Sequence, residues 1–141
     1  MIFASSLPLI TTDFNSFPEI RASFFAFLKS LIKFNFGLLY SLDESHFNTI
    51  LDCVVWSFRH ELSTYSDLGL ELLEDILNNV NKNEVIANMF YPKYHMRRLT
   101  DVLDVMTDGY HKSGLDAHAK IFYLLIHVLT QNLVIYLFYI N

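Results

Sequence analysis

The apolar residues of this chain recur at intervals of three and four, and this spacing limits the fold more than any other feature. The clearest run lies between residues 17 and 32 and consists of Phe17, Ile20, Phe24, Phe27, Leu28, Leu31 and Ile32. Comparable stripes lie within residues 47–58, 70–80 and 122–129. Side chains at this spacing lie on one face of an α-helix. The sequence therefore predicts a series of amphipathic helices.

Glycine and proline are too scarce for a β-sandwich or barrel. The 141 residues include 4 glycines and 3 prolines, whereas such folds need a turn signal between successive short strands. The 52% of hydrophobic residues and 16% of aromatic residues exclude disorder over most of the length. We expect an all-α fold without a sheet.

Short polar segments divide the chain into helical blocks. Pro18 suits a first-turn position, and Ser41 or Asp43 is the candidate N-cap of the next block. Pro92 should break or kink the fourth block near Tyr91, and we expect two helical pieces there. The predicted blocks are the end of a helix at 2–12, a block that starts near Pro18 and ends at Gly37 and the stretch 41–43, and a block that closes near His60. They are followed by blocks at 63–81 and 84–107 and by a last block from residue 115.

The block starts near Pro18, Ser63 and Gly114 recur every 45 to 50 residues, with a second helix inside each interval. This period is typical of the helix pairs of HEAT-type repeats. It predicts an all-α, HEAT-like helical-hairpin solenoid of about two and a half helix pairs. A plain antiparallel bundle would give similar patterning and remains open at this point.

The charge balance disfavours nucleic acid as a direct partner. Lys and Arg number 10 and Asp and Glu number 15, for a net charge of −5. The single cysteine, Cys53, cannot form an intramolecular disulfide, which suits a reducing interior. Residues 1–10 lack a basic region and contain Pro8, so we do not expect a signal peptide.

Three sets of residues invite a catalytic or metal-binding interpretation, and none supports it well. Asp101, Asp104, Asp108 and His111 share a helix face but extend over nearly three turns, so we expect a solvated acidic face. His46, Cys53 and His60 are seven residues apart, about 10 Å along a helix and beyond hydrogen-bond reach. The histidines His111, His118 and His127 have spacings of 7 and 9, which do not match a helical zinc pair.

Cys53 is therefore predicted to be a small core residue. Lys93, His95, Arg97 and Arg98 form the one basic cluster, which could bind an acidic partner but is interpreted as solvating its helix. Glycine-rich phosphate loops and nucleophile elbows are missing from the sequence. We expect no enzyme activity, no catalytic, cofactor-binding or metal-binding residues, and no cofactor.

Several long stretches, in order and at similar spacing, resemble the exportin-1 family of nuclear export receptors over roughly residues 10–127. They are FPEIR at 17–21 with FF at 24–25, ILDCVVWSFRH at 50–60, DLGLELL at 67–73, LNNV at 77–80, MFY at 89–91, VMTD at 105–108 and GLDAHA at 114–119. The resemblance implies C-terminal HEAT repeats of a much longer, ring-shaped receptor that belongs to the importin-beta or karyopherin superfamily.

The resemblance also implies a function. Such a receptor carries cargo with leucine-rich export signals out of the nucleus together with GTP-bound Ran, passes through the nuclear pore and its proteins, and shuttles between nucleus and cytoplasm. The cargo groove and most of the Ran interface of the family lie outside the matched region. We therefore expect the chain alone not to be competent for transport, and we carry over no binding residues.

The C-terminal end departs from the family pattern. We expect residues 1–130 to form exportin-like repeats and residues 131–141 to be an apolar tail. Residues 121–140 have the length of a membrane span. The alternative is therefore a small helical membrane protein that is tail-anchored by residues 121–140, although we regard a membrane as an unlikely partner.

Overall fold

The computed structural model describes residues 18–108 and 115–139, with side chains described as far as residue 127. The described ranges contain five helices: α2 (Pro18–Tyr40), α3 (Glu44–Phe58), α4 (Ser63–Asn81), α5 (Glu84–Thr107) and α6 (Leu115–Tyr139). Within these ranges no residue is in a strand. The predicted all-α class is confirmed, whereas the helix end expected at 2–12 lies outside the described residues.

Polar caps explain where two of the helices begin. The Asp43 side chain accepts a hydrogen bond of 3.1 Å from the backbone N–H of His46 at the start of α3. Asn83 Oδ1 accepts from the backbone N–H groups of Val85 and Ile86 at the start of α5. Both contacts satisfy donors that a helix N-terminus otherwise leaves unpaired.

Pro92 does not divide the fourth block, and the prediction of two separate helical pieces is wrong. Helix α5 continues through Pro92, which is exposed. Proline removes one hydrogen bond from the helix, and on an exposed face water can hydrate the carbonyl that is freed. The non-helical backbone instead lies in α2, where Asn35 has φ −142° and ψ 43° and the helix kinks.

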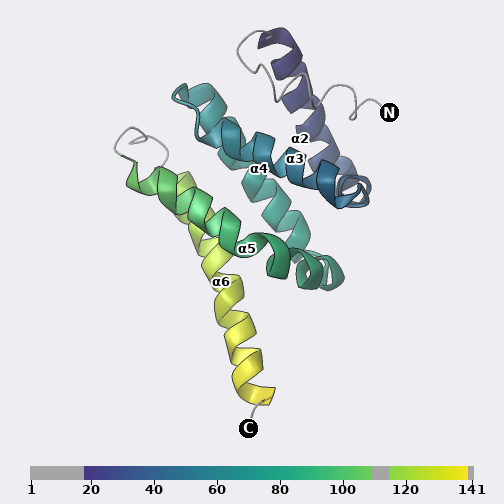
Figure 1. The fold of residues 1–141 in the computed structure, drawn as a ribbon, viewed down its shortest axis with the longest axis vertical. Coiled ribbons are helices and arrows are strands. Elements are labelled where there is room, and N and C mark those ends of the chain that lie inside the picture. Colours follow the sequence, from purple (N-terminus) through teal and green to yellow (C-terminus); the bar gives the residue numbers. More distant parts are fainter. Residues whose placement is uncertain (1–17, 109–114, 140–141) are drawn as a thin grey trace.

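The helices stack in two layers (Figure 1). Helix α4 lies between α2 and α6 in one layer, and α3 and α5 run in the same direction in the other. The hairpins α3–α4 and α5–α6, with α2 as half of a further pair, make two and a half helix pairs. This arrangement confirms the predicted HEAT-like solenoid over the simple bundle.

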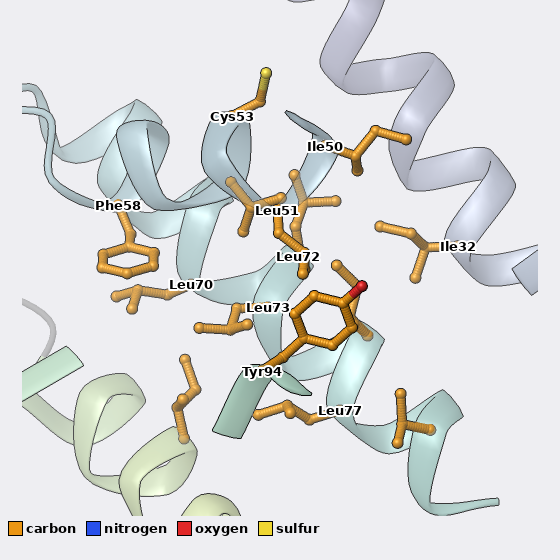
Figure 2. Packing of buried hydrophobic residues seen from close by; sticks show 14 of the residues in the cluster. Ile32, Ile50, Leu51, Cys53, Phe58, Leu70, Leu72, Leu73, Leu77 and Tyr94 are labelled. Carbon is orange, nitrogen blue, oxygen red and sulfur yellow. The ribbon is translucent and has the colours of Figure 1, made fainter. Parts of the chain in front are cut away.

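Helix α4 is the centre of the core and contacts all four other helices. Figure 2 shows Leu70, Leu72, Leu73 and Leu77 of α4 surrounded by side chains from α2, α3 and α5. These four leucines are at most 1% exposed. A helix that is buried on more than one side needs apolar residues beyond a single stripe, which is what the sequence LELL at residues 70–73 provides.

Candidate functional site

The predicted cysteine and histidine set does not form a nucleophilic dyad. Cys53 is buried, and desolvation, with a smaller contribution from the charge of Asp52, raises the pKa of its thiol to about 12. The His46 ring is paired with Asp43. The His60 ring packs against Trp56 and Tyr65, at centroid distances of 5.0 and 5.1 Å. Cys53 is a core residue, as predicted.

The acidic face on α5 is only partly solvated. Asp101 and Asp104 both accept hydrogen bonds from Arg59, the C-cap residue of α3, at 3.1 and 2.9 Å. His111 lies outside the described residues. In the described part of the chain, no group of three or more His, Cys, Asp or Glu side chains could hold a metal ion.

The basic cluster on α5 does not simply solvate its helix, and that interpretation is wrong. Lys93 Nζ donates to Glu44 at 2.8 Å, and Arg97 donates to Asp52 at 2.9 Å. His95 is buried, and its Nε2–H donates to the carbonyl of Leu125 in α6 at 2.9 Å. The cluster ties α5 to its neighbours on both sides.

Arg98 is the largest fully buried side chain among the described residues, at 1% exposed. Its Nη2 lies 3.5 Å from Asp52 Oδ1, and its Nε lies 3.3 Å from Asp101 Oδ2. Burial lowers the pKa of Arg98 from its usual value, and the nearby charge of Asp101 opposes that shift. The guanidinium thus depends on two carboxylates that each have a second cationic partner.

These contacts form an ion-pair ladder between α3 and α5, which we define as three levels along the two parallel helices. The first level joins Glu44 to Lys93. The second joins Asp52 to Arg97 and Arg98. The third joins Arg59 to Asp101 and Asp104.

The sign of the charges reverses along the ladder. Helix α3 contributes the acidic partner at the first two levels, and Arg59, the residue that follows its last turn, is the basic partner at the third. Sliding α5 by one level would bring Arg59 toward Arg97 or Arg98, and like charges repel. The pattern therefore specifies one register of α3 against α5.

Arg21 joins α2 to the corner between α3 and α4. Its guanidinium carbon lies 4.6 Å from the ring centroid of Tyr65 and 5.8 Å from that of Trp56. A guanidinium within about 6 Å of an aromatic centroid is attracted to the ring face. The same corner is closed by Ser57, whose Oγ donates to the Tyr65 carbonyl at 2.7 Å.

Helix α2 presents an apolar face outside this contact. Its large exposed side chains are Ile20, Phe27, Phe34 and Leu38. By length and composition it is the one helix within the described residues that could cross a membrane, a test that core helices of other proteins also pass. The segment 121–140, which is the membrane anchor in the alternative interpretation, is helical as far as Tyr139, and its side chains beyond residue 127 lie outside the described residues.

The layered hairpins and the contacts between successive pairs define a helical-repeat segment, a class in which each unit contacts its neighbours. The sequence matches the family described as CRM1 C terminal over residues 1–139. The chain therefore belongs to the CRM1 C-terminal family.

Curated relatives agree with this assignment. Exportin-1 of Dictyostelium discoideum is 32% identical over 133 residues, which cover 94% of this chain and 13% of the relative. Protein EXPORTIN 1A of Arabidopsis thaliana is 32% identical over 120 residues, 85% of this chain and 11% of the relative. Exportin-1 of Schizosaccharomyces pombe is 31% identical over 132 residues, 93% of this chain and 12% of the relative. The chain thus spans about one eighth of the length of these relatives.

Proposed function

We propose that this chain acts as a repeat segment of a nuclear export receptor and has no catalytic role. In this proposal the complete receptor carries proteins with leucine-rich export signals out of the nucleus with GTP-bound Ran, contacts nuclear pore proteins and shuttles between nucleus and cytoplasm. The family match over residues 1–139 is the observation that carries the proposal.

The contribution of the segment is mechanical. Solenoid repeats contact only their neighbours, so small changes at each joint alter the curvature of the whole and couple distant sites. The joints described above, with the ladder in one layer and the α4–α6 contact in the other, are the parts of this chain that set such curvature. Residues 131–141 stay a predicted apolar tail, and α6 continues into them as far as Tyr139.

A chimeric receptor tests the proposal. The 133 matched residues of the Dictyostelium discoideum exportin-1 are replaced by this chain, and the export of a fluorescent reporter with a leucine-rich signal is followed in cells depleted of their own receptor. We expect the chimera to export the reporter, as the unmodified receptor does. A receptor with the segment deleted is the negative control. Failure of a chimera that accumulates to normal levels would contradict the proposal.

The isolated chain provides the complementary measurement. We expect no saturable capture by an immobilised leucine-rich export signal or by GTP-locked Ran, because the resemblance places the cargo groove and most of the Ran interface outside this segment. Capture at micromolar affinity would show that a binding site lies within these 141 residues.

A further inference from the structure

Helix α2 bends near its end, and the bend lies next to a side chain of α4. The backbone of Asn35 is non-helical, with φ −142° and ψ 43°, and the helix kinks there. In an unbroken α-helix the carbonyl of Ile32 accepts from the backbone N–H of Phe36, across this position. The same carbonyl accepts a hydrogen bond of 3.3 Å from Nδ2 of Asn79 in α4. Insertion of a side chain into the backbone ladder is a recognised cause of sharp bends in helices.

Asn79 joins the backbones of two helices with one amide group. Its Nδ2 also donates to the carbonyl of Asp75, one turn earlier in α4, at 2.8 Å. A side-chain amide nitrogen carries two hydrogens, so both bonds form at once. The bond to Asp75 fixes the direction of the amide, and the bond to Ile32 connects it to α2. The Ile32 side chain is fully buried and points into the core that α4 fills (Figure 2).

The apolar side chains around the bend do not require it. Ile32, Phe36 and Leu39 are buried and are spaced by four and three residues, so they would share one face of a straight helix. The local sequence only makes bending easy, because Asn35, Phe36 and Gly37 are all weaker helix formers than alanine. The hydrogen bond from Asn79 is therefore the contact that accounts for the bend.

We propose that Asn79 is the latch that holds α2 in its bent form, and that the bend sets the position of the next helix pair. Only residues 41–43 connect α2 to α3, so the start of α3 follows the end of α2. Residues 36–40 span about 7.5 Å, and a change of about 20° in the bend moves their far end by about 2–3 Å. This role of Asn79 stands whether or not the segment serves nuclear export.

A row of aromatic contacts links the end of α2 to α3 and α5. Phe36 stacks on Tyr40 at a centroid distance of 6.2 Å, and Tyr40 meets Phe47 of α3 edge-on at 5.3 Å. Phe47 in turn lies 6.3 Å from Phe90 and 5.6 Å from Tyr94 of α5. Aromatic pairs prefer centroid distances of about 4.5–7 Å. This packing, like the short connection, makes α3 follow when the end of α2 moves.

Two substitutions of Asn79 in the full 141-residue chain test the latch. Asn79→Leu removes both donors, and Asn79→Asp keeps the shape of the side chain but replaces the donors by acceptors. The local readout is the chemical shift of the Asn35 Cα carbon, which distinguishes helical from non-helical backbone. We expect it to move to the helical range in both variants. Because Asn35 is already non-helical in the parent chain, loss of the fold cannot imitate this change.

Asn48→Leu is the matched control. Asn48 is half-buried like Asn79 and donates from Nδ2 to the carbonyl of Glu44 at 2.9 Å, but that bond stays within α3. The control should leave the Asn35 shift unchanged. An unchanged Asn35 shift in either Asn79 variant, or the same change in the control, would overturn the proposal.

Spin labels at Ser23→Cys in α2 and Ser45→Cys in α3 report the position of the next pair. Both positions are exposed, and the chain also carries Cys53→Ala. By pulsed electron paramagnetic resonance we expect the distance between the labels to shift by about 2–3 Å in Asn79→Leu and to stay unchanged in Asn48→Leu. A helical Asn35 with an unchanged label distance would show that the bend does not position α3, and would overturn the proposal as well.

Discussion

Gly69 of α4 lies directly against the backbone of Phe58 at the end of α3. A Cβ atom at Gly69 would lie 2.4 Å from the Phe58 backbone nitrogen, closer than any side-chain carbon can approach. Because the neighbouring atom belongs to the backbone, no rotamer change can relieve the contact. The missing side chain is therefore what permits α3 and α4 to cross so closely.

Gly69→Ala should destabilise the chain even though alanine is the better helix former. Glycine costs a helix interior about 1 kcal/mol relative to alanine, and overpacking a tight contact costs about 1–3 kcal/mol. Since the contact is with rigid backbone, we expect a net loss of about 2 kcal/mol, measured by urea unfolding followed by circular dichroism.

Gly37 of α2 is the matched control for this substitution. No atom lies within 4 Å of a Cβ at that position. Gly37→Ala should therefore be neutral or should stabilise by up to about 1 kcal/mol, as the helix propensity predicts. Equal effects of the two substitutions would contradict the packing explanation.

Local sequence signals predicted the helix boundaries well, because their causes are local. The N-cap Asp43 accepts from the backbone N–H of His46, three residues further on, and the polar residues Lys82 and Asn83 follow the end of α4 at Asn81. Pro92 misled the prediction because the cost of an interior proline depends on whether the freed carbonyl faces water. That depends on the tertiary placement of α5.

The ladder could not be predicted from the sequence. Its partners are far apart along the chain: Arg59 pairs with Asp101, and Arg97 pairs with Asp52. Charges on an amphipathic helix predict a solvated face unless the register of the neighbouring helix is known. The burial of Arg98 could not be predicted for the same reason, since the sequence does not give the register of α3 against α5 and arginine is a residue type usually found at the surface.

Substitutions of Arg98 and of Asp101 should lower the free energy of unfolding by different amounts. Arg98→Met removes a buried charge, and its two carboxylate partners keep Arg97 and Arg59. We expect the free energy of unfolding to fall by less than about 1 kcal/mol, because apolar side chains of similar volume can often replace a buried ion pair.

Asp101→Asn leaves the buried guanidinium of Arg98 with only the longer contact of 3.5 Å to Asp52. An uncompensated buried charge typically lowers the free energy of unfolding by about 3–5 kcal/mol. Because the contact with Asp52 remains, we expect a decrease near the lower end of that range. Urea unfolding of both variants is the measurement. A larger loss for Arg98→Met than for Asp101→Asn would contradict this account.

Cys53 should be inert in the folded chain. Burial raises the pKa of its thiol to about 12, so the reactive thiolate is nearly absent at pH 8. We expect alkylation to be at least about a thousandfold slower than for an exposed thiol of ordinary pKa, about 8.5. An added cysteine in the variant Ser45→Cys supplies that exposed thiol in the same chain, and mass spectrometry distinguishes the two sites.

The same shift predicts a dependence of stability on pH. The unfolded chain loses the Cys53 proton above about pH 8.5, whereas the folded chain keeps it to about pH 12. The free energy of unfolding should therefore fall as pH rises above about 8.5, and Cys53→Ala should remove this part of the decline. Identical alkaline profiles for the two chains would contradict the assigned shift.

The isolated chain should self-associate through the apolar face of α2. Phe24 and Leu28 of α2 are buried, whereas Ile20, Phe27, Phe34 and Leu38 of the same helix are exposed. Removing about 300 Å² of apolar surface from water is worth about 7.5 kcal/mol at about 25 cal/mol per Å². That gain is comparable with the stability of a whole domain, at about 5–15 kcal/mol.

Sedimentation velocity over a range of concentrations tests this expectation. The double variant Phe27→Lys and Phe34→Lys places charges on the face and should shift the chain toward monomer. The control Ser45→Lys and Thr64→Lys adds the same charge at exposed polar positions outside α2 and should not. A parent chain that is monomeric at all concentrations would refute the argument. An equal shift toward monomer in the control variant would also refute it, because net charge rather than the α2 face would then govern association.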